Sequence, residues 1–251
     1  MIYVYAIVDD PGVTVTGLTG VADVPLIRVS QGPLAAVCSV HDQLDLEPDA
    51  ATLWQHERVT AKLTERGAVA PVRFGTVFGD GGRVGQVLAD QEVRFTAVLA
   101  RLRGKVELSV RARAPQSDAQ RVEHNGPRFA GNATTDDDCD QGPTASPPRP
   151  GGSGQQYLRS LRDANLGRPG GGLPGALADL HAILSAHADD STLQDGGDET
   201  MVAAYLVSAG QVNVFERAVI DIGDRHPEIE MSLTGPWAPF SFVGEGRAYV
   251  S

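Results

Sequence analysis

The hydrophobic positions of the first hundred residues follow two different periods. Residues 52–66 and 83–102 repeat apolar side chains every three or four positions, as amphipathic helices do. Four other segments are rich in Val, Ile, Ala and Tyr and bounded by turn residues, which predicts strands. They are residues 1–8, 25–40 (two strands that turn at Gly32 and Pro33), 68–78 and 105–110. The order βββαβαβ predicts a mixed or antiparallel sheet with two helices on one face, an α+β plan related to the ferredoxin-like fold.

The last third of the chain repeats this pattern with fewer elements. Apolar residues at helical spacing predict helices at 173–187 and 211–225, and apolar runs predict strands at 200–208 and 228–233. In the last strand, the alternation of Ile229, Met231 and Leu233 with polar residues predicts one buried face. We therefore expect a second small α+β sandwich.

Composition changes sharply between the two halves. Residues 114–154 hold six of the sixteen prolines and almost no large aliphatic side chains, so they offer little surface to bury. We predict a disordered linker there. The expected organisation is an α+β domain at 1–113, the linker at 114–154, and a second α+β domain at 155–251.

Charge narrows the classes of partner. The chain has 21 basic and 32 acidic residues and a formal net charge of −11, which disfavours binding to nucleic acid or to an anionic membrane. The amino terminus lacks a basic leader, and no apolar run approaches the roughly 20 residues that span a bilayer. The two cysteines do not form a disulfide framework. We expect a cytoplasmic protein without a membrane segment.

A glycine-rich turn precedes the helix at 83–102. Gly79, Gly81, Gly82 and Gly85 have the strand-to-helix context of a phosphate-binding loop, but Val84 stands where a dinucleotide loop needs its third glycine. No Lys-Ser/Thr pair follows to make a P-loop. We interpret the segment as a turn and a helix cap.

Candidate catalytic and metal-binding residues do not form a recognisable set. His56 and Glu57 resemble the start of a zinc-protease helix, but Thr60 stands where the second histidine belongs. We interpret His56 as a hydrogen-bonded core residue. Cys38 lies within a predicted strand without an assignable base. We expect no enzyme activity, no metal site and no cofactor.

The segment 233–243, "LTGPWAPFSFV", is rich in aromatic residues and proline. Proline excludes a central strand there, so the aromatics need another place to bury. Trp237 and Phe240 belong either to a plug within the domain, with Trp237 largely buried, or to a docking surface for the other domain or a partner.

Strand alternation suggests a second candidate surface. It sends Tyr3 and Tyr5 to the side of the first sheet opposite the aliphatic residues, and it sends Arg73 and Glu107 to the same side. These four residues would form a polar and aromatic patch suited to a protein partner. The alternative is a local ion pair covered by the second domain.

Several motifs together resemble one family. The chain contains "YVYAIV", "HERVTAKL", "APVRFGTVF", "GKVELSV", "QYLRSL", "MVAAYLVS" and "LTGPWAPFSFV". They cover nearly the whole chain outside the linker and resemble the gas vesicle protein F/L family (GvpF/GvpL). The pairing of an internal P-V-R-F-G strand with a terminal G-P-W-x-P-[FY]-S-F segment is specific to it.

This resemblance implies a non-enzymatic accessory protein of gas vesicle assembly, cytoplasmic and associated with gas vesicles. Its implied partners are the small hydrophobic shell protein and other accessory proteins. A soluble partner would cover apolar surface of the shell protein until it polymerises, because exposed apolar patches aggregate. The alternative is a regulator that senses a small molecule between paired ferredoxin-like domains.

Overall fold

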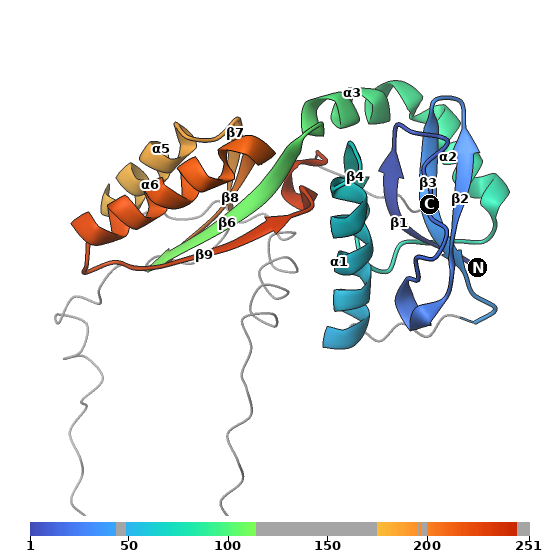
Figure 1. Cartoon of the computed structure of the whole chain (residues 1–251), viewed down its shortest axis with the longest axis horizontal. Coiled ribbons are helices and arrows are strands. Elements are labelled where there is room, and N and C mark those ends of the chain that lie inside the picture. Colours follow the sequence, from blue (N-terminus) through green and yellow to red (C-terminus); the bar gives the residue numbers. More distant parts are fainter. Residues whose placement is uncertain (44–48, 114–174, 195, 197–199, 245–251) are drawn as a thin grey trace, which may run out of the picture.

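The chain forms two antiparallel sheets, each packed against helices (Figure 1). The computed structural model describes residues 1–43, 49–113, 175–194, 196 and 200–244. The first sheet has the order β2 (Leu26–Gln31), β3 (Leu34–Val40), β1 (Ile2–Val8) and β4 (Val69–Pro71), with β5 (Val77–Phe78) also paired to β1. The second has the order β7 (Asp190–Gln194), β8 (Thr200–Ser208), β6 (Lys105–Arg113) and β9 (Glu230–Trp237). The α+β class with two helix-packed sheets is confirmed.

Five α-helices and three short 3-10 helices accompany the strands in the described part of the chain. The α-helices are α1 (Ala50–Thr64), α2 (Gly81–Asp90), α3 (Glu92–Leu102), α5 (Gly175–Ser185) and α6 (Val212–Arg225). The 3-10 helices are η1 (Val21–Asp23), η3 (Ala209–Gln211) and η4 (Phe240–Phe242). The predicted linker at 114–154 lies outside the described residues.

Helices cover both faces of the first sheet, whereas we predicted them on one face. The strand β1 is apolar on both faces and is buried along its whole length. Ile2 and Val4 pack with residues of α2 and α3, while Tyr3 and Tyr5 pack with residues of α1. A register shift between Val4 and Ala6 interrupts the alternation of β1. The first sheet is therefore the middle layer of three.

The strand predicted to complete the first sheet lies instead in the centre of the second. β6 pairs along its full length with β8, from Lys105 opposite Ser208 to Arg113 opposite Thr200, and with β9 on its other side. In the first sheet, β1 already pairs with β3 on one side and with β4 and β5 on the other. The division into domains at 113 and 155 stays a prediction, but β6 joins the strands that follow that boundary.

Two predicted elements are each divided in two. The helix predicted at 83–102 is α2 followed by α3, because Gln91 leaves helical geometry at φ −116° and ψ 19°. The Asp80 carboxylate accepts a hydrogen bond from the Arg83 amide at 2.9 Å at the start of α2. This contact confirms the interpretation of the glycine-rich turn as a helix cap. The predicted strand at 68–78 becomes β4 and β5, separated by a turn in which Gly75 has a φ of +82°.

The second sheet has a helical face and a face directed at the rest of the chain. Leucines of α5 and the buried Phe215, Val219 and Ile222 of α6 pack on Leu108 and Tyr205 of the sheet. The opposite face carries a smaller cluster, consisting of Leu102, Ala204, Leu206 and Phe242. This smaller cluster lies where α3 enters β6 and where the chain continues past β9 (Figure 1).

Candidate partner-binding site at the junction of the two sheets

Glu107 occupies a buried position where the second sheet meets the segment after β9. The side chain is fully buried. The Ser241 amide donates to Glu107 Oε2 at 2.8 Å, and the Ser241 hydroxyl donates to Oε1 at 2.8 Å. Trp237, at the end of β9, is the cross-strand partner of Glu107. The carboxyl group of one central strand thus holds the aromatic segment against the sheet.

Burial controls the charge of this carboxyl group. Desolvation raises the pKa of Glu107 to about 7, although the two hydrogen bonds from Ser241 act in the opposite direction. Glu57 of α1 is half-buried nearby, and desolvation, followed by repulsion from Glu107, raises its pKa to about 7 as well. Two carboxyl groups with raised pKa values therefore lie between α1 and β6.

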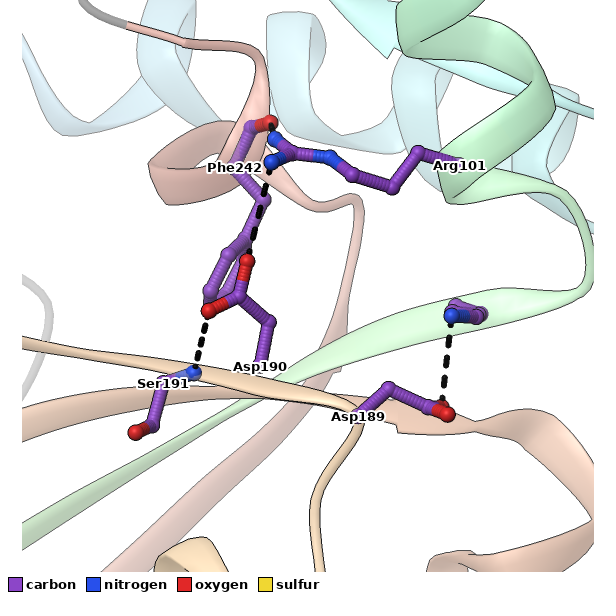
Figure 2. A network of polar contacts seen from close by, with 6 residues as sticks. Arg101, Asp189, Asp190, Ser191 and Phe242 are labelled. Carbon is purple, nitrogen blue, oxygen red and sulfur yellow. Dashed lines mark hydrogen bonds and ion pairs between the residues drawn. The ribbon is translucent and has the colours of Figure 1, made fainter.

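Arg101, near the end of α3, connects the aromatic segment to the edge of the second sheet (Figure 2). Its guanidinium donates to the carbonyl oxygen of Phe242 and lies 3.6 Å from the Asp190 carboxylate at the start of β7. The Ser191 amide also donates to Asp190 Oδ1, at 2.9 Å. These contacts position the C-terminal end of the aromatic segment, while Glu107 binds the segment at Ser241.

Aromatic side chains from α1, from the end of β9 and from the segment after it meet at the same place. Trp54 of α1 is 58% exposed, and its ring centroid lies 6.3 Å from that of the half-buried Trp237. Phe240, also half-buried, lies 6.0 Å from the ring of His56. We call Trp54, Glu57, Trp237 and Phe240 the junction surface. It presents tryptophan to solvent at a seam between the two sheets.

His56 forms the floor beneath these aromatic rings. Its Nε2 lies 2.9 Å from the Val72 carbonyl oxygen, and its Nδ1 lies 2.8 Å from the Tyr3 hydroxyl. Because a carbonyl can only accept, Nε2 carries the hydrogen and Nδ1 accepts from Tyr3. Burial lowers the pKa of His56 to about 4, so the ring is neutral near pH 7. The interpretation of His56 as a hydrogen-bonded core residue is confirmed.

The predicted exposed patch of Tyr3, Tyr5, Arg73 and Glu107 is wrong in its geometry. Tyr3, Tyr5 and Glu107 are fully buried, because α1 covers that side of β1 and because β6 belongs to the second sheet. Arg73 alone is exposed, in the turn between β4 and β5. Tyr3 and Tyr5 do lie together, with ring centroids 4.8 Å apart, but as core residues. A partner contact by Arg73 stays a prediction.

Trp237 lies between the two alternatives that we left open. It is half-buried rather than largely buried, and its indole faces Trp54 of α1. The following residues Ala238 and Phe242 are buried, so the segment does fill space in the interior. The segment is a plug with an accessible aromatic edge, and partner binding by Trp237 and Phe240 stays a prediction.

Three residues of this site were not predicted from the sequence. Trp54 lies next to the apolar stripe of its helix and not on it, and a large exposed aromatic side chain is a typical sign of a contact surface. That signal was available in the sequence. Glu57 and Ser241 had no such signal, because their importance depends on Glu107, which lies 134 positions from Ser241.

The structure also bears on the cysteine, metal and membrane predictions. Cys38 is fully buried in β3, and desolvation raises the pKa of its thiol to about 12, which makes it a poor nucleophile. Among the described residues, no group of three or more His, Cys, Asp or Glu side chains could hold a metal ion. Within the same residues, no helix is long and apolar enough to span a bilayer.

The fold and the junction surface define a two-sheet α+β protein with accessible aromatic residues at the seam. Two solved structures share this fold. GvpF from Microcystis aeruginosa has a TM-score of 0.68 and 17% identity, and the match covers 97% of this chain and 98% of that one. GvpF from Anabaena has a TM-score of 0.70 and 17% identity, and the match covers 100% of this chain and 98% of that one. The family model of the gas vesicle synthesis proteins GvpL/GvpF matches residues 1–244, and the chain belongs to this family.

Similar sequences carry the same family name. Gas vesicle protein L of a Streptomyces species is 30% identical over 268 residues, which cover 96% of this chain and 92% of the relative. Gas vesicle protein F2 of Halobacterium salinarum is 26% identical over 248 residues, which cover 96% and 91%. The resemblance inferred from the sequence motifs is confirmed.

Proposed function

We propose that the chain is a non-enzymatic accessory protein of gas vesicle assembly that binds the hydrophobic shell protein through the junction surface. The observation that supports this proposal is the exposure of Trp54 beside Trp237. Tryptophan is enriched among the residues that dominate binding energy, and it is costly to leave in water. Other accessory proteins of the vesicle would be further partners, and the site of action would be the cytoplasm, at growing vesicles.

The burial of the reactive side chains supports a binding role. His56 is engaged at both ring nitrogens, and Cys38 is fully buried. Neither is presented to a substrate in the described structure. The junction surface, by contrast, offers aromatic rings beside the Glu57 carboxyl group, the combination of apolar area and a polar edge that is common at protein interfaces.

Replacement of Trp54 tests this proposal. The chain is co-expressed with the shell protein and recovered by an affinity tag, and the captured shell protein is quantified. We expect Trp54→Ala to weaken capture by roughly thirtyfold, in line with about 2 kcal/mol for a tryptophan at the centre of an interface. Because the side chain is 58% exposed, the melting temperature should change little.

Val93 provides a matched control. It is 86% exposed on α3, away from the junction surface, so Val93→Ala removes exposed apolar area elsewhere. Capture equal to wild type is expected for this variant. Full capture by Trp54→Ala would refute the assignment of the junction surface. The alternative role as a small-molecule sensor makes a separate prediction, since nucleotides or amino acids would then raise the melting temperature.

A further inference from the structure

A second surface lies on the helical face of the second sheet. α5 and α6 cover one face of that sheet (Figure 1), and Phe242 belongs to the cluster on the other face. Between these helices is a groove of about 300 Å3, with Ile183 of α5 and Val214, Ala218 and Ile222 of α6 among its lining residues. The second sheet separates this groove from the face on which Phe242 and the aromatic segment pack.

The groove leaves aliphatic side chains in contact with solvent. Ile183 is 41% exposed and Val214 is 42% exposed, although both lie beside other apolar residues. Contiguous exposed apolar surface, rimmed by polar groups, is typical of interaction sites, whereas single exposed residues are common everywhere. The floor of the groove is therefore suited to an apolar face of a partner.

Two arginines line the same groove. Arg217 donates from Nε to the Asn213 carbonyl oxygen at 3.1 Å, and Arg225 donates from Nε to the Asp221 carbonyl oxygen at 2.9 Å. These bonds orient the guanidinium groups while using only the Nε–H of each. In the part of the chain that the structure describes, four ion pairs form, and neither arginine belongs to one.

The other polar residues of the groove leave a positive balance. The lining includes one carboxylate, Asp221, and one histidine, His187, against Arg217 and Arg225. The whole chain has a formal net charge of −11, so this local balance is opposite to that of the protein. Charge complementarity selects a partner segment with carboxylates beside its apolar face.

The spacing of the arginines indicates the shape of that segment. Arg217 and Arg225 are eight residues apart on α6, a separation of about 12 Å along the helix axis. Two carboxylates seven or eight residues apart on a second helix have nearly the same separation. Helices that lie in grooves between other helices typically use apolar anchors at positions i, i+3, i+4 and i+7.

The geometry points to a docking site for an amphipathic helix of a partner protein, with aliphatic anchors in the groove between α5 and α6 and carboxylates on Arg217 and Arg225. This site goes beyond the proposed function, because it uses a different face and a partner of different chemistry. It would let the chain hold a second, acidic partner while the junction surface contacts the shell protein.

A designed peptide tests the site on the full chain. The probe is a fluorescein-labelled, 18-residue helical peptide with leucines at i, i+3, i+4 and i+7 and two flanking glutamates eight residues apart. Fluorescence anisotropy should show saturable binding that weakens as salt is raised. A matched peptide with lysines in place of both glutamates should bind at least about tenfold more weakly, because it meets like charge.

Variants of the protein identify the groove. We expect Arg217→Glu combined with Arg225→Glu to weaken probe binding by about tenfold, whereas Arg94→Glu on α3 leaves it unchanged. We expect Val214→Asp to abolish binding, whereas Ile220→Asp, at a residue 60% exposed and outside the groove, does not. Circular dichroism confirms that each variant is folded.

Four outcomes overturn the inference, and three of them come from the binding assay. These are absence of saturable binding, equal binding of the glutamate and lysine peptides, and equal effects of the groove and control variants. A wild-type dimer in sedimentation velocity that the double arginine variant dissociates would show that a second copy of the chain occupies the groove instead. Shell-protein capture is measured on the same variants, and it should be unaffected, so failure here is separable from failure of the proposed function.

Discussion

Replacement of Glu107 by glutamine tests how the junction is held together. Glutamine has nearly the same shape, and its carbonyl oxygen can accept from the Ser241 amide while its NH2 group donates to the Ser241 hydroxyl. Ser241 therefore keeps a hydrogen bond at both groups, with the donor reversed at the hydroxyl, and the ionisable group is removed. Any change in the pH dependence of stability then reports the charge of Glu107, both directly and through its repulsion of Glu57.

The magnitude follows from the pKa shift. Burial raises the pKa of Glu107 from the ordinary 4.5 to about 7 in the folded protein. Between these values the folded state keeps a proton that the unfolded state has released, so wild-type stability falls as pH rises through this window. The full difference corresponds to about 3 kcal/mol, and about 2 kcal/mol of it falls between pH 5.5 and pH 8.

Chemical denaturation measures this difference. Urea unfolding of both proteins is followed by far-ultraviolet circular dichroism from pH 5.5, above the isoelectric point of about 4.9, to pH 8. His56, whose pKa is lowered, contributes the opposite slope, but it contributes equally in both proteins. We expect the Gln variant to gain about 2 kcal/mol relative to wild type across this range.

The same substitution at an exposed carboxylate gives the control. Glu65 is exposed at the end of α1, so Glu65→Gln should shift stability by less than about 0.5 kcal/mol at any pH. A Glu107→Gln variant with a constant stability difference from pH 5.5 to pH 8 would refute the reasoning. It would mean that Glu107 is ionised in the folded protein and stabilised by its hydrogen bonds.

Three further substitutions test packing and hydrogen bonding elsewhere, each by urea denaturation. Tyr5→Phe should cost about 1–3 kcal/mol, because it leaves the buried Val21 amide, which now donates to the hydroxyl at 2.8 Å, without its acceptor; an unchanged midpoint would contradict this. Phe215→Ala should cost about 3–5 kcal/mol, since the ring is fully buried between the second sheet and its two helices. A loss below about 1 kcal/mol would show that the surrounding residues collapse around the gap. Asp49→Ala should cost about 1 kcal/mol, as it removes the cap of α1, while Asp49→Asn should retain most of that stability.

The sequence pattern was sufficient for most elements of the fold. Helical periodicity located the helices, apolar runs bounded by turn residues located most strands, and the cap at the glycine-rich turn followed from local chemistry. β7 was missed because the segment "DSTLQ" is mostly polar and lies at an edge, where one side of the strand stays open. The break at Gln91 was missed because apolar spacing continues across it.

The local sequence pattern does not show which sheet a strand joins. β6 alternates buried and polar residues in a way that fits either sheet, and the choice depends on pairing with β8 and β9, which follow it by many residues. That single error moved Glu107 from an expected surface patch to the interior. Alternation shows which side chains share a face, but only pairing shows what covers that face.

The buried carboxyl group also links the interior to the proposed contact surface. The apolar cluster on this face of the second sheet has four fully packed members, whereas the helical face of the same sheet buries fourteen. Apolar area alone therefore holds the aromatic segment weakly, and the bonds from Ser241 to Glu107 and from Arg101 to Phe242 supply the remaining constraint. Trp237 lies within that segment and faces Trp54. The tryptophan pair requires the docked segment, and the hydrogen bonds of Glu107 and Arg101 help to hold it beside α1.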